Sequence, residues 1–145
     1  MTEPGSPIEI LLVEDNLGDI VLTREAFEEI RLGNALHVVE DGEEALDYLF
    51  QRGKYADAKP PDLILLDLNL PKLSGKEVLE AIKHDPRLML IPVIVLTTSE
   101  EERDVLDVYK RNANCFITKP VDIQQFLKVI RLIESFWLHV VKLAH

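Results

Sequence analysis

The fold of this chain is constrained most by five short apolar runs that alternate with segments of helical spacing. The runs are Ile8–Val13, Ala35–Val39, Leu63–Asp67, Val93–Thr97 and Cys115–Ile117. The first, third and fourth are almost continuously apolar, which is typical of parallel strands covered on both faces. Alternation of strand and helix through five units predicts an open, doubly wound parallel α/β sheet with right-handed crossovers and helices on both faces.

The segments between these runs carry apolar residues at the spacing of amphipathic helices. Two later helices are expected around Val105–Tyr109 and from Ile123 onward, and the prolines in Gly53–Pro61 predict a long surface connection. The residues that mark the first three helices are Leu17, Ile20, Val21, Phe27 and Ile30, then Ala45, Leu46 and Leu49, then Val78, Leu79 and Ile82.

Composition narrows the possible functions. With 145 residues, of which 47% are hydrophobic, the chain is expected to form one globular domain, and it has no apolar run of the about 18 residues that a membrane span needs. Its 16 basic and 26 acidic residues give a net charge of −10, which disfavours nucleic-acid binding. Residues Met1–Pro7 resemble no signal peptide and are expected to be a flexible tail, and Cys115 is the single cysteine, so we predict a cytoplasmic location.

Polar residues follow four of the predicted strands at their carboxyl ends. In such sheets the ligand site lies beyond these ends, so the side chains are expected to converge on one crevice. The residues concerned are Glu14 and Asp15, Asp67 and Asn69, Thr97, and Lys119 followed by Pro120.

Three carboxylates in one crevice repel one another unless a cation lies between them. A ligand set made only of oxygen atoms suits Mg²⁺, which keeps waters that a phosphate displaces. We therefore predict a magnesium-dependent phosphoryl site, in which Lys119 would pair with a phosphoryl oxygen. The alternative is that Asp15 or Asn16 merely caps a helix and that Thr97 merely ends a strand.

The order and spacing of these polar residues resemble the receiver domain of two-component response regulators. The resemblance covers residues 8–133 and implies a flavodoxin-like five-stranded sheet in the order 2-1-3-4-5. It also implies that Asp67 accepts a phosphoryl group from a histidine kinase, and that Glu14, Asp15, Asp67 and the backbone carbonyl of Asn69 hold Mg²⁺. The resemblance rests on Glu14-Asp15, on Asp67 followed by Asn69, Pro71 and Gly75, on Thr97, and on Lys119-Pro120.

The same resemblance assigns the remaining positions. Thr97 would donate to one phosphoryl oxygen, Lys119 would neutralise another, and the Lys119–Pro120 peptide bond would be cis. Phe116, three residues before Lys119, would be the aromatic that moves together with Thr97 on activation. Phenylalanine stands where many relatives have tyrosine, so a hydroxyl contact is lost, and the alternative is that Phe116 is an ordinary core residue.

The carboxyl-terminal helical pattern is more apolar than one domain requires. Its apolar arc is about twice the roughly 100° of an ordinary surface helix, so part of it should meet another chain. We expect residues 134–145 to extend the last helix and to form a homodimer interface that uses Phe136, Trp137 and Leu138. The alternative is that this segment packs back on its own domain.

Two features resemble a narrower group, the small response regulators that are paired with phytochromes. They are the Phe136-Trp137-Leu138 ending and the long Arg52–Pro61 connection. The resemblance implies a light-sensing histidine kinase as partner. Because no effector domain follows, we expect a stand-alone switch that signals through protein contacts and that phosphorylates and dephosphorylates only itself.

Two other functions compete with this interpretation. A haloacid dehalogenase-like hydrolase would need a second aspartate two residues after the nucleophile, where this chain has Asn69, which cannot protonate a leaving group. A nucleotide- or flavin-binding protein would need a G-x-G-x-x-G sequence or a P-loop, and the chain has neither. The four histidines share no metal-binding spacing and are expected at surface or edge positions.

Overall fold

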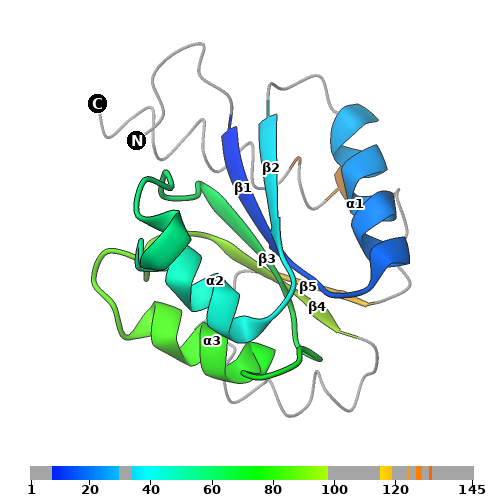
Figure 1. The fold of residues 1–145 in the computed structure, drawn as a ribbon. Coiled ribbons are helices and arrows are strands. Elements are labelled where there is room, and N and C mark those ends of the chain that lie inside the picture. Colours follow the sequence, from blue (N-terminus) through cyan, green and yellow to red (C-terminus); the bar gives the residue numbers. More distant parts are fainter. Residues whose placement is uncertain are drawn as a thin grey trace.

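The computed structural model describes residues 8–29, 34–97 and 115–118, together with Gln124, Leu127, Lys128 and Arg131. They include a five-stranded parallel sheet in the order β2-β1-β3-β4-β5, which confirms the predicted fold class (Figure 1). The strands are β1 (Ile8–Val13), β2 (Asn34–Val39), β3 (Leu63–Asp67), β4 (Val93–Thr97) and β5 (Cys115–Thr118).

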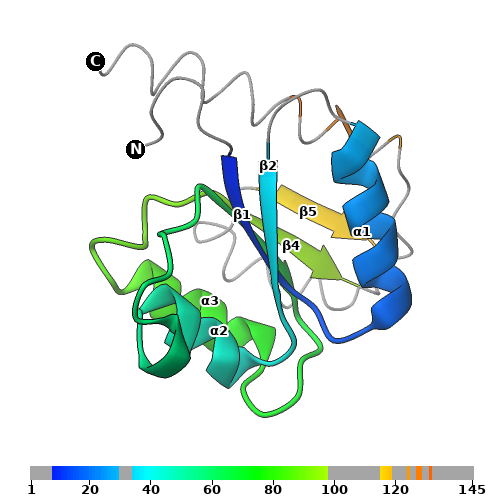
Figure 2. The same ribbon diagram turned by 45° about the horizontal axis from the view of Figure 1, so that its top comes forward.

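The helices lie on both faces of the sheet: α1 is on one side, and α2 and α3 are together on the other (Figures 1 and 2). A side-chain oxygen before each helix accepts a backbone N–H from its first turn, namely Asn16 for α1, Asp41 for α2 and Ser74 for α3. Asn16, not Asp15, therefore caps α1. The helices are α1 (Leu17–Glu29), α2 (Gly42–Leu49), the 3₁₀ turn η1 (Gly53–Tyr55) and α3 (Gly75–Lys83).

The sheet separates two apolar clusters because successive side chains of a strand point to opposite faces. On β3, for example, Leu66 packs with the cluster under α2 and α3, whereas Leu65 packs with the cluster under α1, and both are 0% exposed. Burial on both faces explains why the central strands read as continuous apolar runs. Among the described residues, no helix has the length and apolar character needed to cross a membrane.

Helix α1 forms as predicted, but its buried face differs from the predicted apolar stripe. Leu17 and Val21 are 72% and 52% exposed. The residues that α1 buries are Ile20, Thr23, Ala26 and Phe27, while Ile30 lies outside the described residues. Thr23 is buried at no polar cost because its hydroxyl donates to the Asp19 carbonyl at 2.8 Å. Leu17 and Val21 therefore mark the helix in the sequence but lie outside its buried face.

The predicted surface connection between α2 and β3 folds back on α2. Its central residue is Tyr55, whose hydroxyl donates to the Glu44 carboxylate and whose ring lies 5.1 Å from the Tyr48 ring. Burial raises the pKa of Tyr55 above its ordinary value of 10.0, and the bond to Glu44 raises it further. The half-buried side chain of Tyr55 therefore holds the connection against α2.

Tyr55→Phe is expected to lower the free energy of unfolding by about 1 kcal/mol, because it deletes one hydrogen bond to a carboxylate. Since the pKa of Tyr55 is raised on folding above 10.0, the phenol's contribution is fully present below that value and declines as the pH rises past it. Urea unfolding should therefore give a constant difference from the parent up to about pH 9 and a smaller one above about pH 10.

Lys54→Met is the matched control for this experiment. The Lys54 ammonium lies 4.0 Å from the same Glu44 carboxylate but is 74% exposed, so its loss should change the free energy of unfolding by less than about 0.5 kcal/mol. A difference between Tyr55→Phe and the parent that does not vary with pH would contradict the assigned role of the hydroxyl.

Candidate metal and phosphoryl site

The register of the parallel strands brings the predicted site residues to one edge of the sheet. Val13 on β1 is paired with Leu66 on β3, so the next residues along the two strands, Glu14 and Asp67, reach the same level. On the other side of β3, Asp67 is paired with Leu96 of β4, which directly precedes Thr97. Three strands therefore end together where the sequence places its carboxylates and a hydroxyl residue.

Glu14 is 0% exposed, which is unusual for a carboxylate. Its backbone N–H donates to the Val39 carbonyl at 3.0 Å, which continues the ladder between β1 and β2 by one residue. Its Oε2 atom accepts the backbone N–H groups of Asp15 at 3.1 Å and Asn16 at 3.4 Å. These bonds hold the side chain over the turn into α1 and leave Asp15 at the exposed rim.

Asp67 is the last residue of β3 and is 2% exposed. Its Oδ1 atom accepts the backbone N–H of Asn69 at 3.2 Å, which orients the carboxylate. Gly75 packs behind it, since a Cβ atom there would lie 2.3 Å from the Asp67 carbonyl oxygen. Only glycine permits this approach of α3 to the end of β3. Gly75 belongs to the motif that resembles receiver domains, but the sequence alone did not predict this packing role.

The structure brings three predicted metal ligands together. Glu14, Asp15 and Asp67 each offer a carboxylate oxygen, and these oxygens lie within 4.8 Å of one another. Two of the three residues are buried and one is exposed, so the cluster is open to solvent on one side. Such a set of hard oxygen donors fits a small divalent cation, and Mg²⁺ in particular is bound in proteins by one or two carboxylates plus waters.

The other predicted site residues are only partly described. Thr97 ends β4 opposite Thr118 of β5, and Phe116 lies opposite Val95, but these strand ends are described by their backbone only. Lys119 and Pro120 lie outside the described residues, as do Phe136, Trp137, Leu138 and the tail at 1–7. Of the histidines, His37 on the edge strand β2 and His84 after α3 are exposed, as predicted.

Comparison with known proteins decides the family. The family model described as the response regulator receiver domain matches residues 10–131. The chain belongs to this family. The receiver domain is 45% identical to the response regulator Rcp1 of Synechocystis sp. over 141 residues, which cover 97% of this chain and 96% of that protein.

Two solved structures resemble the receiver domain over most of its length. The phosphorylated cyanobacterial phytochrome response regulator RcpA is 48% identical and has a TM-score of 0.78, with 92% of this chain and 96% of that chain covered. The Mn²⁺-bound form of Rcp1 is 45% identical and has a TM-score of 0.77, with the same coverage of 92% and 96%. The resemblance to receiver domains, and to those of phytochrome-associated regulators, is confirmed. The comparisons do not support the alternatives of a hydrolase or of a nucleotide- or flavin-binding protein.

Proposed function

We propose that this receiver domain is a phosphoacceptor switch in which Asp67 takes a phosphoryl group from a histidine kinase. The observation that carries the proposal is the convergence of the Glu14, Asp15 and Asp67 oxygens within 4.8 Å at the carboxyl edge of the sheet. A buried aspartate flanked by two other acids is suited to phosphoryl transfer when a divalent cation is bound beside it.

Magnesium is the cation that fits this cluster. Glu14, Asp15 and Asp67 would hold it, together with the backbone carbonyl of Asn69, which follows Asp67 by two residues. Bound there, the ion supplies neutralisation of the charge on the equatorial phosphoryl oxygens. Support for a divalent ion comes from the donor set itself and from the Mn²⁺-bound structure of Rcp1.

Asp67 attacks as a carboxylate, so no general base is needed. A bond forms between a carboxylate oxygen and phosphorus while the bond from phosphorus to the histidine nitrogen breaks, and the imidazole leaves with the electron pair. The N–H of Asn69 orients the nucleophile, since it donates to Asp67 Oδ1 at 3.2 Å. Hydrolysis of the resulting acylphosphate returns Asp67 to its resting state, so the chain turns over only its own phosphoryl group.

Thr97 and Lys119 complete the site in this proposal. Thr97 would donate its hydroxyl to one phosphoryl oxygen, and the Lys119 ammonium would neutralise another, with a cis bond to Pro120. Support for Thr97 comes from its backbone position, one residue after the partner of Asp67 on β4. Phe116, on the strand next to Thr97, would move inward behind that hydroxyl and carry the signal to the surface.

Lys119→Ala tests whether Lys119 acts on the phosphoryl group and not on the binding of Mg²⁺. The variant should bind Mg²⁺ at least as tightly as the parent, because the lysine is no ligand and its positive charge is removed. It should accept the phosphoryl group at least about tenfold more slowly, because one oxygen loses its counter-charge. The measurement is Mg²⁺ titration beside the rate of labelling by acetyl phosphate. Lys128→Ala, which removes the same charge from an exposed position, is the control. Equal rates in the two variants would contradict the role of Lys119.

The donor in this proposal is a histidine kinase of the phytochrome type, which acts with this chain in the cytoplasm. Support comes from the relatives, since RcpA is named a cyanobacterial phytochrome response regulator and is similar over 92% of this chain. The test is transfer in vitro from purified, phosphorylated kinases to this chain with Mg²⁺ present. Rapid transfer from a phytochrome kinase, and slow transfer from an unrelated one, is expected. Equal rates from both kinases would contradict the phytochrome assignment.

The second part of the proposal concerns assembly. We propose that residues 8–133 form the receiver domain and that residues 134–145 extend the last helix into a homodimer interface with Phe136, Trp137 and Leu138. Support comes from the wide apolar arc of that segment. Sedimentation equilibrium should give a dimer for the full chain and a monomer for a chain truncated after Ile133. A monomer in both cases would contradict the proposal.

A further inference from the structure

The loop between β3 and α3 carries Asn69 and is fixed at its inner side by the end of β3. The backbone N–H of Gly75 donates to the Leu68 carbonyl at 3.0 Å, which closes the loop on itself. Leu68 is 5% exposed and belongs to the cluster under α2 and α3. These contacts determine where the loop starts and ends, but they leave its outer residues, Pro71 to Leu73, to be positioned by something else.

The outer side of the loop packs against the first residue of α2. The Gly42 N–H points at the Pro71 carbonyl at 3.5 Å. A Cβ atom on Gly42 would lie 2.2 Å from the Leu73 carbonyl oxygen and 2.8 Å from its carbonyl carbon. Because these are backbone atoms, no side-chain movement relieves the contact. The loop and the start of α2 therefore meet backbone to backbone, at a distance that glycine alone permits.

Ion pairs made by Lys72 also hold the loop against the start of α2. It has a φ of +66°, a left-handed conformation that residues with a side chain adopt rarely. Its ammonium lies 3.6 Å from Asp41 Oδ2 and 3.9 Å from Glu43 Oε2. Asp41 uses its other oxygen to cap α2, accepting the Glu44 N–H at 2.7 Å, so its carboxylate is already oriented. The carboxylates of the α2 cap, Asp41, and of Glu43 in the first turn thus both face the Lys72 ammonium.

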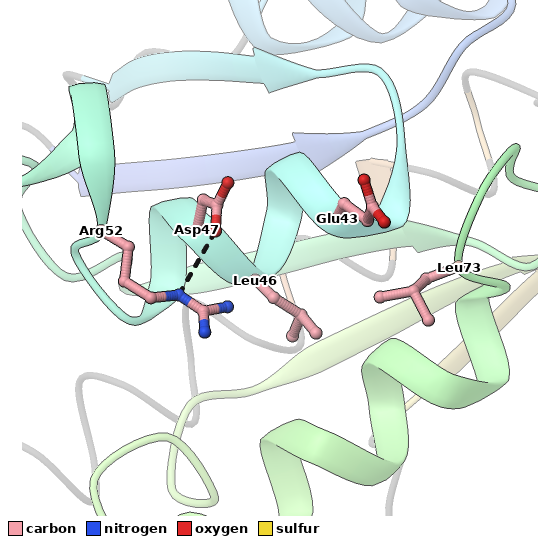
Figure 3. A pocket seen from close by; sticks show the side chains of 5 residues that line it. All are labelled: Glu43, Leu46, Asp47, Arg52 and Leu73. Atoms are coloured by element: carbon pink, nitrogen blue, oxygen red, sulfur yellow. Dashed lines mark ion pairs between the residues drawn. The ribbon is translucent and has the colours of Figure 1, made fainter.

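A groove lies next to this contact and shares Glu43 and Leu73 with it. The groove has a volume of about 320 Å³ and is lined by Glu43, Leu46, Asp47, Arg52 and Leu73 (Figure 3). In Figure 3, Leu73 on the loop and Glu43 on α2 stand at the same end of the groove. None of the proposed metal ligands lines it.

We propose that Asp41, Gly42 and Glu43 at the start of α2 together with Lys72 form a clamp, here called the α2 clamp, that positions the β3–α3 loop for binding of Mg²⁺. The inference rests on the proposed function and adds positioning residues to it. Asn69 lies in this loop, two residues after Asp67, and its N–H already orients the Asp67 carboxylate. Displacing the loop outward would move the Asn69 backbone away from the carboxylate cluster without unfolding the sheet.

The first test compares Lys72→Met with Lys76→Met by calorimetric Mg²⁺ titration of the full chain. Lys76 lies in the first turn of α3, two residues past the loop, and makes no ion pair within the part of the chain that the structure describes. Both variants remove one positive charge near the site, so long-range attraction for Mg²⁺ rises similarly in both. Lys72→Met should bind Mg²⁺ about threefold more weakly than Lys76→Met, the size expected when surface ion pairs are lost. Lys72→Arg should bind as the parent does.

The second test uses the backbone contact. Gly42→Ala should weaken Mg²⁺ binding about tenfold, the loss typical of changes behind a metal ligand. Gly53→Ala is its control: Gly53 has a φ of +57°, which alanine adopts only with strain, but an added Cβ atom there would meet no other atom within 4 Å. It should lower the melting temperature and leave the Mg²⁺ dissociation constant unchanged. If Gly42→Ala fails to fold, the comparison of Lys72→Met with Lys76→Met still tests the α2 clamp.

The outcomes separate this inference from the proposed function. A parent chain without saturable Mg²⁺ binding would overturn both. A parent that binds Mg²⁺, with Lys72→Met equal to Lys76→Met, would overturn the α2 clamp alone. Without Mg²⁺ the melting temperature of Lys72→Met should lie within about 2 °C of that of Lys76→Met, since only surface ion pairs are lost. If Lys72→Met has both weaker Mg²⁺ binding and a melting temperature lower by more than this, the role of Lys72 is structural and the inference fails.

Discussion

Asp67→Asn is expected to abolish phosphorylation while the chain stays folded. The amide has nearly the shape of the carboxylate, and its oxygen still accepts the Asn69 N–H that lies 3.2 Å from Asp67 Oδ1 in the parent. It is, however, not a nucleophile toward phosphorus, so no acylphosphate forms. The measurement is incubation with acetyl phosphate and Mg²⁺, followed by intact mass and by the alkali lability of the adduct.

A matched control excludes an effect of charge alone. Asp57→Asn removes one negative charge from the exposed α2–β3 connection and should be labelled like the parent. Peptide mapping of the labelled parent should place the phosphoryl group on Asp67. Labelling of Asp67→Asn at the parental level would mean that the nucleophile has been assigned to the wrong residue.

The second large effect is expected when Glu14→Gln and Asp15→Asn are combined. In the parent, Mg²⁺ at 100 times its dissociation constant should raise the free energy of unfolding by about 2.7 kcal/mol, since the ion binds only the folded chain. The double variant should show no such increase, because two of the three carboxylates in the cluster are gone. Without Mg²⁺ it should be at least as stable as the parent, because Asp67 then has no neighbouring negative charge from these two residues.

Urea unfolding in EDTA and in Mg²⁺ measures both effects. Glu25→Gln combined with Glu28→Gln is the control, since it removes two exposed carboxylates from α1 and should keep the full increase with Mg²⁺. An unchanged Mg²⁺ effect in the Glu14 and Asp15 variant would falsify the assigned ligands. A large loss of stability in EDTA would instead show that Glu14 is needed for its bonds to the turn before α1.

The strands could be predicted from the sequence almost to the residue. The runs Ile8–Val13, Leu63–Asp67 and Val93–Thr97 have the bounds that the structure gives to β1, β3 and β4. The other two strands differ by one residue at one end. The reason is that a strand covered on both faces is apolar at nearly every position, so its length appears directly as the length of the apolar run. The position of Asp67 followed from the same run.

The buried face of α1 could not be read in the same way. Leu17 and Val21 fit a helical stripe but face solvent, whereas Thr23 and Ala26 are fully buried. A helix packs close to a sheet through small residues, and a threonine hydroxyl is satisfied inside the helix by a carbonyl one turn earlier. Residue type alone therefore gave the helix but not its orientation.

The α2 clamp left almost no trace in the sequence. Lysine is unremarkable at position 72, and only the structure gives it a φ of +66° and two carboxylates within 4.0 Å. Gly42 was only a weak signal, because a glycine allows another segment of the chain to approach closely but does not show which segment does so. Contacts between a loop and a helix that are far apart in the sequence depend on the assembled fold.

The division of the interior by the sheet has a consequence for engineering. Leu65 and Leu66 are neighbours in the chain, yet each belongs to a separate set of packed side chains on its own side of β3. Substitutions on opposite sides share few partners, so their energetic effects should add, as they do for sites without common neighbours. The side chains beneath α1 can therefore be redesigned, for instance for higher thermal stability. No compensating substitutions are then needed in the opposite layer, which supports the β3–α3 loop.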